Sequence, residues 1–185
     1  MLDFYYSTMS GGKSTALLQR RHNLTSIGKR VLVMTSALDD RFGIGKITSR
    51  MGPQCDAVLY SRDTVFDSTL DLGDVAELIL DEAQFLTGAQ VRQIHENFCA
   101  RGQRVSCFGL RSTFQGLPFE GSAALMAIAD NLHELSTLCQ CGSKATLNQR
   151  IDALGHPVRS GPEVEIGGDN RYRPVCASCF HAVSR

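Results

Sequence analysis

Apolar and polar positions alternate along the first part of the chain in a way that predicts both strands and helices. Short apolar runs, rich in aromatic or β-branched residues, predict buried strands at residues 2–7, 30–36, 75–82 and 104–110. Helical spacing of apolar residues predicts a helix that starts at Lys13 and ends near Gly28, and another at residues 87–102. Strands that alternate with helices are typical of a mostly parallel sheet covered on both faces, so we expect an α/β fold.

Two other segments have a different texture. Residues 41–53 are rich in glycine and predict a mobile loop. From Cys139 onward, glycine, proline, paired cysteines and short extended pieces replace the strand and helix pattern. We therefore expect a main α/β domain over residues 1–137 and a small second lobe over residues 138–185.

Charge and hydropathy narrow the classes of partner. The chain has 185 residues, with 19 Lys and Arg balanced by 19 Asp and Glu, so it has no net charge to attract nucleic acid or an anionic membrane. A small substrate fits this balance better. No apolar run approaches the roughly 18 residues of a membrane span, and no basic segment followed by an apolar one opens the chain. We expect a cytoplasmic protein without a membrane or nucleic-acid partner.

The stretch FYYSTMSGGKST, residues 4–15, ends in the second half of a phosphate-binding loop, Gly12-Lys13-Ser14. Ser7 stands where the strict pattern begins with glycine, and a lone Gly-Lys-Ser is also compatible with an ordinary helix start. The expected strand before it and the helix after it favour a P-loop, because consecutive backbone N–H groups can then wrap the phosphates before the helix begins.

An acidic pair follows the third expected strand in the sequence LILDE, which supplies Asp81 and Glu82. Such a pair is often no more than two solvated residues after a strand. A P-loop, however, needs an acidic residue at the end of another strand to hold Mg²⁺ against the phosphates. In that arrangement Ser14 and Asp81 serve the metal, Lys13 serves the transferred phosphate, and Glu82 is placed to take a proton from an attacking hydroxyl.

Four of the seven cysteines form two close pairs near the C-terminus. Cys176 and Cys179 have the two-residue gap that places both thiolates on one metal, whereas Cys139 and Cys141 are separated by a single residue. Free thiols are the alternative. Four cysteines in a lobe too small for a core of its own favour a structural Zn²⁺ site.

The segments that carry these features resemble, in order and over nearly the whole chain, the cytosolic (type II) thymidine kinases. These segments are FYYSTMSGGKSTALL, SALDDRFG, ILDEAQFL, FGLRSTFQGLPFEGS, a cysteine pair and EIGGDNRYRPVC. The loop of that family departs from the strict glycine pattern at its first position, as Ser7 does. Its first cysteine pair commonly has a two-residue gap, from which Cys139 and Cys141 depart. The resemblance implies a RecA-like P-loop domain with a small zinc-stabilised lobe that carries a lasso segment.

The resemblance also assigns roles to matching positions. The residues implied to cradle the triphosphate of ATP are Ser10, Gly11, Gly12, Lys13, Ser14 and Thr15. Asp39 and Arg41 match an acidic and basic pair near the phosphates, with Asp81 also at the metal, and Glu82 matches the general base. The residues implied to surround the thymine ring are Met9, Phe85, Leu110, Phe114 and Phe119, with Glu165, Ile166, Gly167, Gly168 and Tyr172 in the lasso. Taken alone, Phe114 and Phe119 would be read as core residues.

The resemblance thus implies transfer of the γ-phosphoryl group of ATP to the 5'-hydroxyl of thymidine, with deoxyuridine as a further acceptor. The resemblance also implies a homotetramer and feedback inhibition by dTTP. One alternative is a P-loop ATPase or regulatory nucleic-acid-binding module with a zinc lobe, which the neutral charge disfavours. The other is a catalytically silent relative. It is disfavoured by the joint presence of Lys13, Ser14, Arg41, Asp81 and Glu82.

Overall fold

The computed structural model describes residues 1–39, 43–162 and 171–182. Within these residues a six-stranded sheet forms the main body, and each pair of neighbouring strands in it is parallel. From one edge to the other, its strands are β5 (Val58–Tyr60), β2 (Arg30–Ser36), β6 (Val75–Leu80), β7 (Arg104–Leu110), β1 (Leu2–Ser7) and β8 (Asn131–Glu134).

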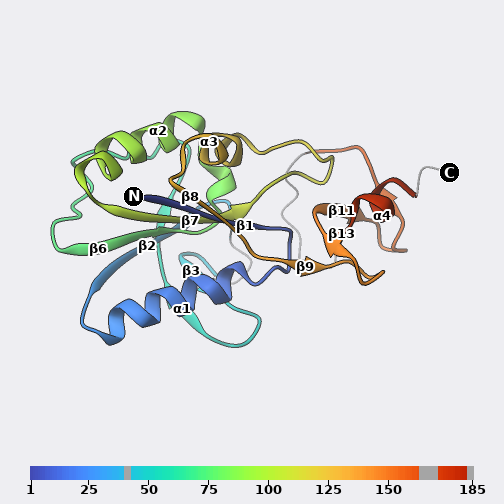
Figure 1. Cartoon of the computed structure of the whole chain (residues 1–185), viewed down its shortest axis with the longest axis horizontal. Coiled ribbons are helices and arrows are strands. Elements are labelled where there is room, and N and C mark those ends of the chain that lie inside the picture. The colour runs from blue at the N-terminus through green and yellow to red at the C-terminus, as the bar shows by residue number, and fades with distance from the viewer. Residues whose placement is uncertain (40–42, 163–170, 183–185) are drawn as a thin grey trace.

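Helices cover both faces of this sheet (Figure 1). α1 (Lys13–Ser26) lies on one face, and α2 (Gly88–Asn97) and α3 (Glu120–Ile128) lie on the other. A capping box between Thr87 and Gln90 starts α2, since the Thr87 side chain accepts the Gln90 N–H and the Gln90 side chain accepts the Thr87 N–H.

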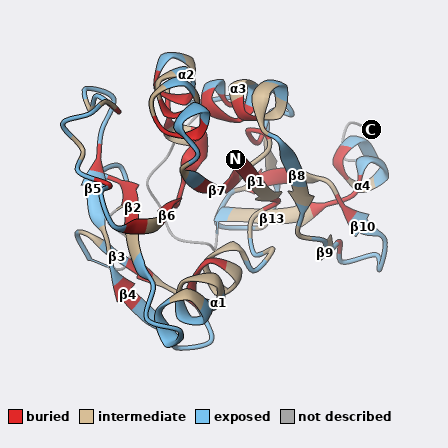
Figure 2. Ribbon diagram, turned by 60° about the vertical axis from the view of Figure 1, so that its left-hand side comes forward, coloured by how far each residue is buried: buried red, intermediate tan, exposed pale blue. Residues whose placement is uncertain are grey.

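Apolar side chains fill the space on each face of the sheet. Because successive residues of a strand point to opposite faces, β6 contributes Leu78 and Leu80 to the cluster under α2 and α3. Ile94 and Leu125 belong to the same cluster, whereas Ile79 belongs to the smaller cluster under α1. Figure 2 shows this arrangement as buried residues on the strands and on the inward sides of the helices.

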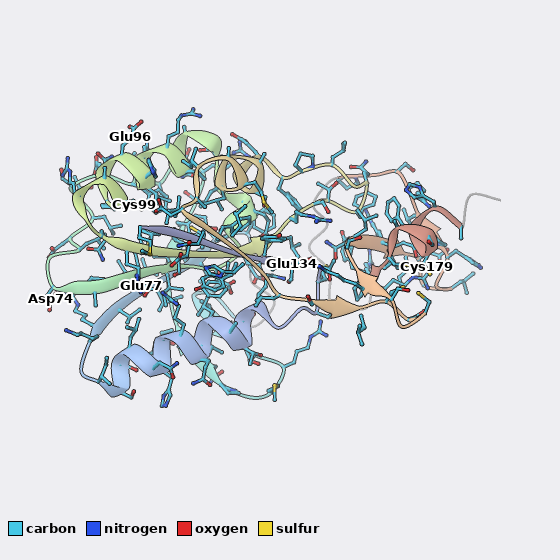
Figure 3. All side chains as sticks on the ribbon, in the orientation of Figure 1. Asp74, Glu77, Glu96, Cys99, Glu134 and Cys179 are labelled. Atoms are coloured by element: carbon cyan, nitrogen blue, oxygen red, sulfur yellow. The ribbon has the colours of Figure 1, made fainter. Side chains whose placement is uncertain are left out.

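Arg20 fastens α1 to the sheet through ion pairs with Asp3 of β1, at 3.8 Å, and with Glu77 of β6. Glu77 is 1 % exposed and is labelled in Figure 3. The Arg20 guanidinium also donates to the Tyr5 hydroxyl at 3.1 Å. A carboxylate as buried as that of Glu77 requires such a partner, so the contact fixes the position of α1 over β1 and β6.

The four predicted strands and both predicted helices are present, with shifted ends. The expected strand at residues 75–82 ends at Leu80, so Asp81 and Glu82 lie just past its carboxyl end. The second helix ends at Asn97 and is followed by a 3₁₀ turn, η2 (Cys99–Arg101). Among the helices that the structure describes, none combines the length and apolar character needed to cross a membrane.

The prediction of a loop over residues 41–53 is corrected in part. Lys46–Thr48 form β3, which pairs antiparallel with β4 (Gln54–Asp56), while residues 40–42 lie outside the described residues. Ile47 and Cys55 face each other across this hairpin and are both buried against the α1 side of the sheet. Burial of these two side chains gives the segment its structure, and the many glycines masked that signal.

The C-terminal part of the chain forms a small lobe at one end of the molecule (Figure 1). It consists of β9 (Thr137–Leu138), β10 (Lys144–Ala145), β11 (Leu147–Ile151), β12 (Pro157–Val158), β13 (Tyr172–Val175) and α4 (Ala177–Ala182). β11 pairs antiparallel with both β12 and β13. The lobe has a compact cluster of its own that includes Cys139, Cys176 and Phe180. The domain boundary after residue 137 stays a prediction.

Candidate active site

The segment after β1 has the geometry of a phosphate-binding loop. Ser10 and Gly12 have positive φ angles, 61° and 76°, and Gly12 is the N-cap residue of α1. A Cβ atom at Gly11 would lie 2.4 Å from Ser7 Oγ, so this position requires glycine. Lys13 Nζ donates to Ser7 Oγ and to Thr8 O, both at 3.2 Å. The hydroxyl of Ser7 therefore helps to hold the loop lysine.

A cavity of about 260 Å³ opens over this loop. Of the predicted site residues, those that line it are Met9, Ser10, Gly11, Gly12, Lys13, Ser14, Thr15, Glu82 and Leu110. The structure thus brings the loop together with the segments that follow β6 and β7, because the carboxyl ends of parallel strands meet at the same edge of a sheet.

The β3–β4 hairpin supplies lining residues that the sequence did not indicate. Thr48, Ser49, Arg50 and Met51 complete the wall of the cavity. Ser49 is buried, and its Oγ lies 2.7 Å from Thr15 Oγ1, which ties the turn of the hairpin to the start of α1. No motif marks these residues. Ile47 and Thr48 before Gly52 are β-branched, but the piece that pairs with them, Gln54–Asp56, has no β-branched residue.

Asp81 and Glu82 differ in their surroundings although they are neighbours. Asp81 is 4 % exposed, and its Oδ1 has no hydrogen-bond partner among the described residues. Burial, reinforced by the charge of Glu82, raises the pKa of Asp81 to about 7. Glu82 has a left-handed backbone with φ 52°, and its carboxylate accepts a hydrogen bond from Gln84 Nε2. Tyr60 Oη lies 3.0 Å from Asp81 O and 2.9 Å from Glu82 O, which holds this turn from behind.

The predicted ring-binding residues are only partly gathered at the cavity. Met9 and Leu110 line it, whereas Phe85, Phe114 and Phe119 are absent from its wall. Phe85 and Phe119 pack edge to face at 6.0 Å between ring centroids.

The other two aromatic residues meet each other. The ring centroids of Phe114 and Tyr172 lie 6.4 Å apart. Tyr172, which was predicted to belong to the lasso, therefore lies beside a predicted ring-binding residue. Asp39 is described but does not line the cavity. The remaining predicted site residues lie outside the described residues: Arg41, Glu165, Ile166, Gly167 and Gly168.

Asn148 is a further residue that the sequence did not single out. It belongs to β11 of the small lobe, is 3 % exposed, and accepts the Met9 N–H at 2.8 Å. Its amide nitrogen donates to Ser112 O at 3.2 Å. One lobe side chain thus contacts the P-loop and the segment after β7. A lone asparagine in a strand gives no sequence signal for such a contact.

The two cysteine pairs converge in the small lobe. The Sγ atoms of Cys139, Cys141, Cys176 and Cys179 all lie within 4.8 Å of one another, and those of Cys141 and Cys176 are 3.6 Å apart. Figure 3 shows Cys179 in this lobe, far from Cys99, which lies on the side of the sheet that α2 and α3 cover. The one-residue gap between Cys139 and Cys141 therefore does not prevent the four thiols from facing a common point.

Comparison with known proteins identifies the family. The family model described as thymidine kinase matches residues 1–180. The chain belongs to the thymidine kinase family. A thymidine kinase of Chromobacterium violaceum is 50 % identical over 181 residues, which cover 97 % of each chain. One of Albidiferax ferrireducens is 46 % identical over 97 % of this chain and 91 % of its own.

Further comparisons agree with membership of the thymidine kinase family. A thymidine kinase of Xanthomonas oryzae pv. oryzae is 44 % identical over 100 % of this chain and 90 % of its own. Among solved structures, the Pif1 helicase from Candida albicans is similar with a TM-score of 0.42 and 16 % identity, covering 71 % of this chain and 35 % of its own. That likeness is too weak to carry an argument. Thymidine kinase family membership supports thymidine phosphorylation and does not favour the ATPase or nucleic-acid-binding alternative.

Proposed function

We propose that the chain transfers the γ-phosphoryl group of ATP to the 5'-hydroxyl of thymidine, giving dTMP and ADP. One observation carries the proposal: a single cavity is lined by Lys13 of the P-loop and by Glu82, which follows β6. A donor phosphate and an acceptor hydroxyl can both be bound there. Family membership supports thymidine and ATP as the two substrates.

The P-loop is the proposed site for the triphosphate. The turn at Ser10 to Gly12 leads into α1, and the first backbone N–H groups of a helix and its dipole favour negative charge. Lys13 would move from its contacts with Ser7 and Thr8 to the transferred phosphate. Thr15 stands next to the hairpin through its contact with Ser49. Positioning and charge neutralisation of this kind provide most of the catalysis of phosphoryl transfer.

Mg²⁺ fits the acidic end of β6. The buried Oδ1 of Asp81 has no hydrogen-bond partner among the described residues, and a buried carboxylate oxygen needs a cation or a donor. Asp81 and Ser14 would hold the ion, with Asp39 and Arg41 contributing near the phosphates. When bound, Mg²⁺ neutralises charge on the β- and γ-phosphates.

Glu82 is the proposed general base. The 5'-oxygen of thymidine attacks the γ-phosphorus, the bond to the bridging oxygen of ADP breaks, and the hydroxyl proton passes to the Glu82 carboxylate. Met9, Leu110, Phe85, Phe114 and Phe119 would surround the thymine ring. The lasso residues would close over it: Glu165, Ile166, Gly167, Gly168 and Tyr172. Walls of this kind accept deoxyuridine as well, because it lacks only a methyl group.

A structural zinc ion fits the four cysteines. Tetrahedral Zn²⁺ with bonds of about 2.3 Å sets its sulfur atoms about 3.8 Å apart, close to the 3.6 Å between Cys141 and Cys176. Cys139 and Cys179 would supply the other two ligands. Family resemblance further supports a homotetramer, inhibition by dTTP in the thymidine site, and a cytoplasmic location.

The test replaces Glu82 with glutamine, which keeps size and hydrogen bonding but cannot take the proton. We expect single-turnover dTMP formation to fall by about 100- to 10,000-fold, with the affinities for thymidine and Mg-ATP changed much less. Activity within a few-fold of the parent would remove Glu82 as the base. ATP turnover that responds to DNA and not to thymidine would instead support the ATPase alternative.

A further inference from the structure

The side chain of Gln84 lies between the carboxylate of Glu82 and the end of β7. It is 2 % exposed, and its Nε2 donates to Glu82 Oε2. Its Oε1 accepts the backbone N–H of Leu110 at 3.0 Å. One buried amide therefore bridges the proposed base and a residue that lines the same cavity.

The orientation of this amide is fixed by its partners. A carboxylate can only accept a hydrogen bond, and a backbone N–H can only donate one. Rotating the Gln84 amide by half a turn would set its oxygen against the Glu82 carboxylate and its NH₂ group against the N–H of Leu110. Both contacts would then be repulsive, so the Gln84 amide can adopt one orientation, with Nε2 toward Glu82 and Oε1 toward Leu110.

The surrounding backbone leaves this bridge little room to move. A Cβ atom at Gly109 would lie 2.9 Å from Gln84 Oε1 and 3.0 Å from Gln84 N, so the absence of a side chain there lets Gln84 lie flat against β7. On the other side of the bridge, Ser122 Oγ of α3 donates to Leu110 O. The Leu110 residue is therefore held through both its N–H and its carbonyl group.

We propose that Gln84 is a positioning residue for phosphoryl transfer, which orients the Glu82 carboxylate relative to the nucleoside side of the cavity. The proposal rests on the proposed role of Glu82 as the base. Misplacing a reacting group by about 1 Å can lower a rate by about 100-fold, and Gln84 fixes one oxygen of the carboxylate to the rigid end of β7.

Gln84→Met tests the bridge because it keeps the length and volume of the side chain and removes both hydrogen bonds. We expect single-turnover dTMP formation to fall by about 10- to 100-fold, while thymidine and Mg-ATP affinities change by no more than about threefold. Such a split between rate and affinity would not follow from a general loss of packing.

Gln90→Met is the matched control. Gln90 is also a buried glutamine, at 3 % exposed, and its amide donates to Ser61 O and Thr64 O, each at 2.8 Å, away from the cavity. The same chemical change there removes these hydrogen bonds and the capping-box bond from the Thr87 N–H, so stability should fall at least as much, while the rate in the folded enzyme stays within about twofold of the parent.

A double-mutant cycle with Glu82→Gln decides whether Gln84 acts through Glu82. If it does, adding Gln84→Met to Glu82→Gln should change the rate by less than about threefold, because the base is already lost. An equal loss in both backgrounds, or no loss in the parent background, would overturn the proposal while leaving Glu82 as the base. A Glu82→Gln variant that stays active would overturn both the base and its positioning residue.

Discussion

Asp81, the buried neighbour of the cavity-lining Glu82, shows how burial changes a single residue. A carboxyl whose ordinary pKa is 3.8 has a pKa of about 7 here, mainly through desolvation and then through the charge of Glu82. Between these two pH values the folded state binds more protons than the unfolded state. Protein free of Mg²⁺ and nucleotide should therefore lose stability from this group as the pH rises from about 4 to about 7.

Asp81→Asn should remove this contribution, because the amide does not titrate. We expect the unfolding free energy of the variant to decline less than that of the parent between pH 4.5 and pH 7.5, measured by denaturant titration without Mg²⁺ or nucleotide. Parallel profiles for the two proteins would show that Asp81 does not take up a proton in this range.

At the scale of elements, β11 ties the small lobe to the P-loop through Asn148. Its replacement by alanine would leave the N–H of Met9 and the carbonyl of Ser112 without this partner. Each unsatisfied buried group is destabilising by roughly 1–3 kcal/mol, so the midpoint of unfolding of Asn148→Ala should lie at a lower denaturant concentration than that of the parent.

Catalysis should change in the same variant. Because Met9 lines the cavity, the KM for thymidine should rise several-fold more than that for ATP. Asn23→Ala, at an exposed position on α1, is the control and should leave both KM values unchanged. An equal rise in the KM values for thymidine and for ATP would argue that Asn148 does not specifically support thymidine binding.

The element scale also shows where sequence patterns succeed. The central strands β1, β2, β6 and β7 are buried on both faces and read as continuous apolar runs, so they were predictable. The edge strands β5 and β8 are short and partly exposed, which removes that signal. For α3, its apolar residues in EGSAALMAI resemble a buried run more than an amphipathic stripe.

In the candidate site, too, some residues could be predicted from the sequence and others could not. The placement of motif residues such as Lys13 and Glu82 at one cavity was predictable, because phosphate and metal chemistry demands particular residue types at fixed places after strands. Gln84, Ser49 and Asn148 were not, because each acts through one or two hydrogen bonds that exist only once distant segments have been brought together.

At the scale of the whole molecule, the proposed zinc ion would stabilise the small lobe through its four cysteines. Protein purified without chelator should contain about one Zn²⁺ per chain, as measured by elemental analysis, and chelation should lower its melting temperature. Cys176→Ser should lose the metal, whereas Cys55→Ser, a buried cysteine outside the lobe, should keep it. Metal-free protein of unchanged stability would contradict a structural zinc site.

The left-handed backbone of Glu82 has a consequence for evolution and engineering. A non-glycine residue in this conformation is destabilising by about 1–3 kcal/mol, and glycine or asparagine would adopt it more easily. Selection for folding alone therefore favours those residues at position 82, whereas the proposed role of Glu82 as the base requires the carboxylate. If Glu82 is the base, libraries screened only for heat resistance would drift toward well-folded, inactive chains at this one position, so a stabilised variant must be selected for turnover as well.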